Sequence, residues 1–178
     1  MKKIIYIICI LTILVGCYKK DVFTLPSKEE VEKYLIENNM TPITFKNEDS
    51  STLVLYEKIN VTGLVILSVY KDSDILNAIK STNVESGNED PISTSLVSLG
   101  SDNRVTIGTI IIKSSDILHK AYKVKIEIKT RNGLVEGSEF FNNKKGAIIY
   151  FKRDDMVDAK IQRFIIFDKD GKEIYVSN

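Results

Sequence analysis

The sequence predicts an α+β fold rich in strands, with one N-terminal helix followed by an antiparallel, β-sandwich-like body of about 8–10 short strands. Three features support this fold class. A Ser27-x-x-Glu30 pattern opens a stretch of helical periodicity near the start of the chain. Beyond residue 50, strand-like patterns with a period of two predominate. Turn dipeptides such as Asn132-Gly133 separate these strand patterns, as they do in hairpins.

The predicted helix begins at Ser27 and ends at Asn38. Ser27 and Glu30 match a capping box, in which each side chain accepts a hydrogen bond from the other residue's backbone N–H. Acidic residues in the first turn also suit the positive end of the helix dipole. Val31 and Leu35 lie four positions apart, so they share one helical face, which we expect to be buried.

Two kinds of strand are expected in the body. Leu53–Lys58 and Leu64–Lys71 are apolar on both faces, as buried central strands are. The segment from Tyr122 to Ile128 alternates apolar with charged residues, which predicts a strand whose polar face is in water. The charged positions are Lys123, Lys125, Glu127 and Lys129. Further strands are expected at Val105–Ile112, with Gly108 marking a bulge, and at Gly146–Phe151, Gln162–Phe167 and Glu173–Val176.

The length of 178 residues fits one domain, which we place at residues 27–178. Ser81–Asp90 is a polar run interpreted as a loop, and any sub-domain boundary is expected within residues 81–104. From about Val105 onward the hairpin spacing is immunoglobulin-like. The Cys and Trp residues of true immunoglobulin domains are missing, so only the architecture is suggested.

Two segments echo each other, Lys71–Leu76 and Lys113–Leu118, and each follows an apolar strand. Ser-Asp pairs favour helix N-termini, so a short helix is expected in both places. The alternative is a trace of two duplicated halves.

The composition excludes several functional classes. With 25 basic and 24 acidic residues the net charge is +1, and no strongly basic patch indicates nucleic-acid binding. Both cysteines, Cys9 and Cys17, lie in the first seventeen residues, so the body has neither a disulfide framework nor a thiolate zinc site.

The N-terminus has the layout of an export signal. A basic start precedes the uncharged stretch Ile4–Gly16. This stretch is too short for a membrane-spanning helix, which needs about 20 residues. Leu14-Val15-Gly16-Cys17 resembles the lipobox of bacterial lipoprotein precursors. The resemblance implies a diacylglyceryl group on the Cys17 sulfur and cleavage between Gly16 and Cys17.

This resemblance divides the N-terminal region into a signal peptide, residues 1–16, and a lipidated tether, residues 17–26. The alternatives are an uncleaved core strand, or a plain secretory signal with a chance cysteine. The closing stretch FIIFDKDGKEIY is also similar to the tail of small, uncharacterised β-rich lipoproteins of Gram-positive bacteria.

One pattern in the body matches a catalytic motif. Ser68-x-x-Lys71 fits the nucleophile motif of penicillin-binding enzymes. That motif needs a helix, whereas residues three apart in a strand point to opposite faces. The partner motifs are also missing, so we predict no catalytic residue here.

Three acidic patterns have structural interpretations. Asp168 to Glu173 suggests half a calcium loop, but the glycine comes at the fourth position, so a hairpin turn is favoured. Asp116 and His119 share a helical face, yet two ligands do not make a metal site. The third pattern is a solvated acidic cluster, formed by Asp154, Asp155 and Asp158.

These features together predict a lipoprotein anchored through Cys17 on the extracytoplasmic face of the cell membrane. The body is expected to be a non-enzymatic module that binds another envelope protein or a wall component, with no cofactor. The alternative is a small wall-associated enzyme or inhibitor whose site is assembled only in three dimensions, with His119 as its one histidine.

Overall fold

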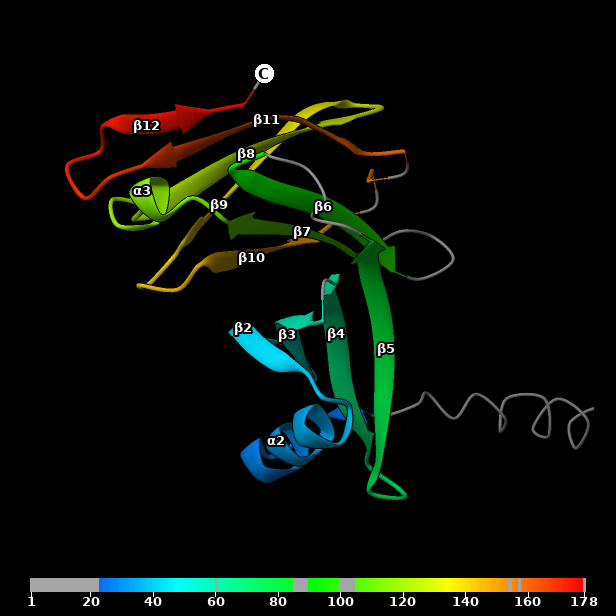
Figure 1. The fold of residues 1–178 in the computed structure, drawn as a ribbon. Helices are drawn as coiled ribbons and strands as arrows, with labels where there is room; N and C mark the ends of the chain where they lie inside the picture. The colour runs from blue at the N-terminus through cyan, green and yellow to red at the C-terminus, as the bar shows by residue number, and fades with distance from the viewer. Residues whose placement is uncertain are drawn as a thin grey trace, which may run out of the picture.

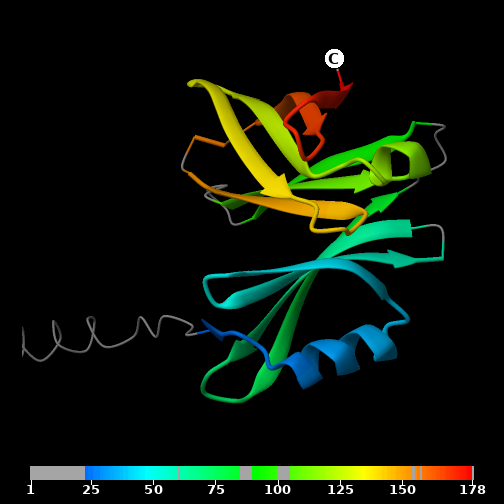
Figure 2. The ribbon, with the colours of Figure 1, turned by 90° about the vertical axis from the view of Figure 1, so that its left-hand side faces the viewer.

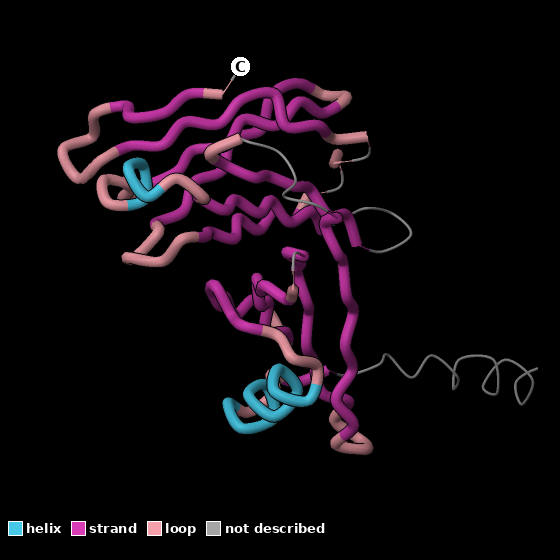
Figure 3. Tube along the Cα trace, viewed as in Figure 1, coloured by secondary structure: helices cyan, strands magenta, loops and turns pink. Residues whose placement is uncertain are grey.

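A computed structural model describes residues 23–59, 61–84, 90–99, 105–153, 155–156 and 158–177. In these parts of the chain the fold is β-rich, and all strand pairs are antiparallel. Strands dominate the trace, with one longer and one very short helix (Figure 3). The strands form three sheets that stack on one another (Figures 1 and 2).

The first sheet, here called the N-terminal sheet, has the order β5-β4-β3-β2, with β1 also paired to β4. Its strands are β1 (Phe23–Thr24), β2 (Thr41–Glu48), β3 (Ser51–Lys58), β4 (Val61–Tyr70) and β5 (Ile75–Val84). The central sheet has the order β10-β7-β6, from β6 (Ile92–Leu99), β7 (Val105–Ile112) and β10 (Gly146–Lys152). The outer sheet has the order β12-β11-β8-β9, from β8 (Lys123–Thr130), β9 (Gly133–Phe140), β11 (Lys160–Phe167) and β12 (Glu173–Val176).

Helix α2 (Lys28–Glu37) covers the free face of the N-terminal sheet (Figure 1). The capping box is present: Glu30 N–H donates to Ser27 Oγ at 3.2 Å, and Ser27 N–H donates to Glu30 Oε2 at 2.7 Å. Val31 and Leu35 are buried against alternate residues of β3 and β4. The helix is not the first element, however, because the short strand β1 precedes it.

Strand β1 also shortens the predicted tether. Phe23 and Thr24 pair with Tyr70 and Val69 of β4, and the Phe23 ring lies 4.6 Å from the Tyr70 ring. Residues 23 and 24 therefore belong to the sheet. Two residues are too few to show a period of two, which is why the sequence pattern did not indicate this strand.

Three other local predictions are wrong. Ser81–Val84, predicted as loop, completes β5 by pairing with β4. Lys71–Leu76 contains a turn that leads into β5, whereas the echo segment does form a short helix, α3 (Ser115–Leu118), capped by Ser114. Gly108 pairs in regular register on both sides of β7, so it marks no bulge.

The central sheet is covered on both faces, which explains the continuous apolar character of β7. Ile107 and Ile111 contribute to a cluster shared with the N-terminal sheet. Ile110 and Ile112 contribute to the cluster shared with the outer sheet. Because side chains alternate along a strand, an apolar run is the pattern expected when both faces are buried.

Candidate functional site

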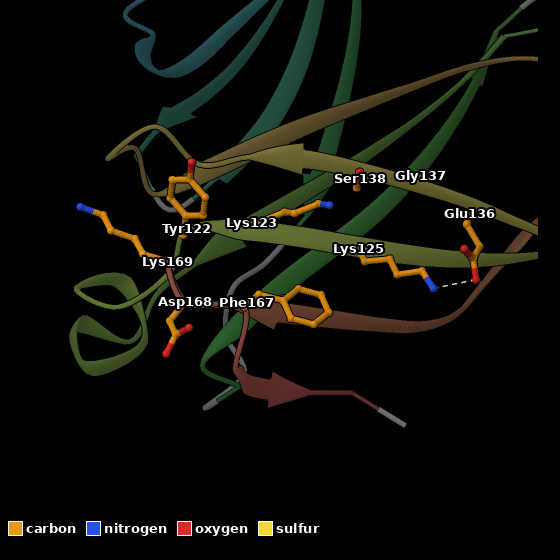
Figure 4. A pocket seen from close by; sticks show the side chains of 10 residues that line it. Tyr122, Lys123, Lys125, Glu136, Gly137, Ser138, Phe167, Asp168 and Lys169 are labelled. Carbon is orange, nitrogen blue, oxygen red and sulfur yellow. Dashed lines mark ion pairs between the residues drawn. The ribbon is translucent and has the colours of Figure 1, made fainter.

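A groove of about 590 Å³ lies on the exposed face of the outer sheet. It lies over β8 between the second half of β9 and the turn after β11 (Figure 4). The residues that line it are Tyr122, Lys123, Lys125, Glu136, Gly137, Ser138, Phe167, Asp168, Lys169 and Gly171. We call it the β8 groove.

Strand register sets the composition of this face. Lys123, Lys125, Glu127 and Lys129 of β8 point away from the core, since Val124, Ile126 and Ile128 are buried against the central sheet. Their direct partners on β9 are Phe140, Ser138, Glu136 and Leu134. On β11, Phe167 lies opposite Lys123 and Arg163 lies opposite Glu127. Three strands thus bring cationic, acidic and apolar side chains together.

The middle of the face is neutralised by its own ion pairs. Lys125 Nζ lies 2.7 Å from Glu136 Oε1 and 3.5 Å from Glu127 Oε1, and Arg163 lies 3.4 Å from the same Glu127 oxygen. Hydrogen bonding to Glu136 is the main cause that raises the pKa of Lys125. Lys125 therefore stays protonated at neutral pH and acts as a cation paired with Glu136 and Glu127.

Exposed apolar groups accompany the cations. The rings of Tyr122 and Phe140 are 5.2 Å apart, edge to face, and both residues remain about two-fifths exposed. Lys123 Nζ lies 5.7 Å from the Phe140 ring centre, within cation–π range. Leu134 is 58% exposed. Exposed aromatic and apolar side chains gathered in one area are typical of binding surfaces.

Gly16 and Cys17 lie outside the described residues, so the lipid-attachment hypothesis rests on the sequence alone. Within the described part of the chain, no helix is both long and apolar enough to cross a membrane.

The catalytic motif is not assembled. Ser68 is buried in β4, whereas Lys71 follows the strand and is exposed. The serine and lysine therefore lack the shared helical face that the motif requires.

The acidic patterns have local roles. Asp168 Oδ1 accepts hydrogen bonds from the backbone N–H groups of Asp170 and Lys172, which makes the segment the β11–β12 turn. In the predicted acidic cluster, Asp155 pairs with Arg153 at 2.9 Å, and Asp158 pairs with Arg131 at 2.5 Å. Asp154 lies outside the described residues.

His119 and Asp116 are exposed on α3 and its C-terminal cap. No group of three or more potential metal ligands is gathered among the described residues.

Sequence reasoning predicted Lys123 and Lys125 only as the solvated face of a strand. It missed Phe167, Glu136 and Ser138, which come from two other strands. A signal was present in β9, where Leu134, Glu136, Ser138 and Phe140 recur at every second position. The Asn132-Gly133 turn pairs β9 with β8, whereas β11 and its Phe167 are placed beside β8 only by the fold.

Comparison with known proteins finds no match to a protein-family model, a curated protein or a solved structure.

Proposed function

We propose that this protein is a membrane-anchored extracytoplasmic lipoprotein whose β-rich body is a non-enzymatic binding module. The observation that carries the proposal is the β8 groove, where Lys123 and Lys125 lie beside exposed rings on an open sheet face. The β8 groove presents positive charge and exposed apolar side chains to a partner. Its Lys125 is kept protonated by the ion pair with Glu136.

The layer order supports a groove directed away from the membrane. Cys17 precedes β1 by six residues, a span of at most about 20 Å when extended. β1 lies in the N-terminal sheet, and the outer sheet lies at the far end of the molecule (Figures 1 and 2). A body anchored through Cys17 would therefore present its α2 end to the bilayer and the β8 groove to other envelope components.

We also propose that β6 to β12 form an immunoglobulin-like sandwich. The first, second and fifth of these seven strands (β6, β7 and β10) lie in the central sheet. The third, sixth and seventh (β8, β11 and β12) lie in the outer sheet. Constant-type immunoglobulin domains divide the same six strands in this way. Here the fourth strand, β9, joins the third instead of the fifth, which widens the sheet that carries the groove.

The anchor is tested by replacing Cys17 with alanine and growing cells with a labelled fatty acid. We expect the Cys17→Ala protein to be an uncleaved precursor without label. Cys9→Ala is the matched control, because it removes the other cysteine and should be cleaved and labelled as the native protein is. Normal cleavage and labelling of the Cys17→Ala protein would contradict the anchor.

The binding role is tested by placing a photo-crosslinking residue in the groove at Ser138 and, as a control, on α2 at Ile36, which is 75% exposed. In intact cells we expect a defined crosslinked product from position 138 and none shared with position 36. Equal products from the two positions, or none from position 138, would contradict binding through the groove.

A further inference from the structure

The charges on the exposed face of the outer sheet follow an ordered pattern. The central charges, Lys125, Glu127 and Arg163, are held in ion pairs within the face. Lys123 at one end of β8 and Lys129 at the other have no ion-pair partner among the described residues. Lys123 and Lys129 can therefore form ion pairs with a partner at the two ends of β8.

Each free lysine lies beside an exposed apolar side chain. The direct cross-strand partner of Lys123 is Phe140, and that of Lys129 is Leu134. Phe140 is 43% exposed and Leu134 is 58% exposed. At the second end Lys160 of β11 also lies opposite Lys129, which adds a further positive charge.

We propose that the exposed face of the outer sheet along β8, from the β8 groove at Lys123 to the far end of the strand at Lys129, binds an extended acidic segment of a partner protein, with one carboxylate at Lys123 and another at Lys129. The two lysines are six residues apart on a strand, a distance of about 20 Å. An extended partner advances by the same rise per residue, so its acidic side chains stand at positions one and seven. Uncharged side chains at positions three and five face the same way and lie over Lys125 and Glu127, whose charges are already paired within the face.

Charge complementarity favours a polypeptide over a phosphate polymer. The face keeps the carboxylates of Glu127 and Glu136 between its free lysines. A chain with a phosphate at every repeat would place negative charge against these carboxylates, and like charges there cost binding free energy. A peptide with acids only at its ends avoids this repulsion, because its uncharged central residues lie over charges that are already paired within the face.

This inference rests on the proposed binding role, and it is tested with the full-length protein in a non-ionic detergent. The probe is a capped, fluorescent peptide Glu-Ser-Leu-Ser-Leu-Ser-Glu, followed by fluorescence anisotropy. The matched peptide Glu-Ser-Leu-Ser-Glu-Ser-Leu has the same composition but acids at positions one and five. We expect the first peptide to bind at least about fivefold more tightly, because only its spacing reaches both lysines. Equal affinities would overturn the inference.

Charge-reversal variants locate the site. Lys123→Glu and Lys129→Glu should each weaken binding of the first peptide at least about fivefold, whereas Lys58→Glu in the N-terminal sheet should leave it unchanged. The double reversal should instead bind Lys-Ser-Leu-Ser-Leu-Ser-Lys, a gain that a misfolded protein could not show. Unchanged binding in both single variants, or no gain in the double variant, would overturn the inference.

Three further outcomes separate this inference from the proposed function. Inorganic polyphosphate that binds the groove more tightly than the peptide would overturn the polypeptide assignment and leave a binding module in place. A lipidated protein whose partner crosslinks to α2 and not to position 138 would overturn the groove as the binding face. Loss of lipid attachment to Cys17 would contradict the anchor alone.

Discussion

Both faces of the central sheet are buried, and they differ in the number and kind of side chains that pack there. The face toward the outer sheet packs fourteen buried residues, which include the rings of Phe141, Phe151 and Phe164. The face toward the N-terminal sheet packs eight, all of them aliphatic. The first face resembles a domain core, whereas the second resembles an interface between two units.

Ion pairs at the rim mark the second face as an interface. Lys145 Nζ lies 2.6 Å from Glu57 Oε1, and Lys152 Nζ lies 2.9 Å from Asp49 Oδ2. Lys46 of β2 also pairs with Glu139 of β9. An apolar centre with a charged rim is the usual anatomy of a protein interface. The N-terminal sheet with α2 therefore docks onto a sandwich that has its own larger core.

The largest expected effect comes from a matched pair of substitutions on β7. Ile110→Ala empties space in the sandwich core, and we expect a loss of about 3–5 kcal/mol in unfolding free energy. Ile111→Ala, on the opposite face, should cost about 2–3 kcal/mol, because the two sheets can settle toward each other. Urea unfolding measures both values. A larger loss for Ile111→Ala would reverse the proposed ranking of the two faces.

Hydrogen exchange of backbone amides tests the same difference between the two faces of the central sheet. After Ile111→Ala, amides of the N-terminal sheet should exchange faster than those of β8 and β11, whereas Ile110→Ala should accelerate exchange in both units. Uniform acceleration by both variants would show that the chain unfolds as one unit.

Glycines where layers meet closely give the next largest effect. A Cβ on Gly137 would lie 2.5 Å from Phe151 Cζ and 2.6 Å from Ile149 Cγ2. A Cβ on Gly146 would lie 2.7 Å from Leu55 Cδ2 and 2.8 Å from Ile43 Cγ2, across the interface. Overpacking of this kind costs about 1–3 kcal/mol. We expect Gly137→Ala to cost more, since an aromatic ring moves aside less easily than an aliphatic branch.

Gly108→Ala is the control, because its nearest contacts, at 3.5–3.7 Å, are ordinary packing distances. We expect its midpoint of urea unfolding to stay close to that of the native protein. If Gly108→Ala lowered the unfolding free energy as much as Gly137→Ala does, the close approach of layers at Gly137 and Gly146 would not explain the effect of their substitutions.

The rim ion pair of Lys145 and Glu57 should contribute less than the apolar centre. Both side chains are about 40% exposed, so a double-mutant cycle with Lys145→Met and Glu57→Gln should give about 0.2–1 kcal/mol of coupling. Coupling above the cost of Ile111→Ala would show that charges, and not apolar contacts, hold the units together.

The smallest expected effect is a pH dependence at Asp49. Its hydrogen bond to Lys152 lowers the pKa of Asp49, so the stabilisation it provides is present above the unfolded pKa, about 3.9, and is lost as the pH falls through the lowered value. The stability difference between the native protein and Asp49→Asn should therefore shrink on acidification below about pH 4. Urea midpoints at pH 7 and pH 3 measure it. A difference that grows at pH 3 would contradict the assignment.

Tyr150 belongs to the same rim. Its hydroxyl donates to Asp49 Oδ2 at 3.3 Å, and burial, followed by the Asp49 charge, raises the pKa of Tyr150 to about 12. The phenol is therefore neutral throughout the pH range of the Asp49 experiment, so it does not complicate the interpretation.

Short-range patterns predicted much of the secondary structure. Alternation indicated β8, the Asn132-Gly133 turn leads into β9, and Asp168 organises the turn before β12. Each depends on contacts between residues a few positions apart, and such contacts can be recognised in a linear sequence. Strands β2, β5 and β6 were not indicated, because polar residues in partly exposed strands weaken the period of two.

The β8 groove could be predicted only in part. The sequence indicated that Lys123 and Lys125 face solvent, but Phe167 lies over forty positions away from both. Strand pairing across such distances depends on burial of the whole sheet, and no local pattern encodes it. Phe140 and Leu134 acquire their lysine neighbours through the register of the β8–β9 hairpin, which the turn signal alone did not specify.

The sequence by itself determined the capped helix, the strands around residues 53–71 and 105–129, and the hypothesis that Cys17 carries a lipid. Only the tertiary structure decided that β7 is buried on both faces and that an open sheet face becomes a charged groove. The reason is that caps and alternation arise from neighbours along the chain, whereas layers and grooves arise from which strands pair and which sheets stack.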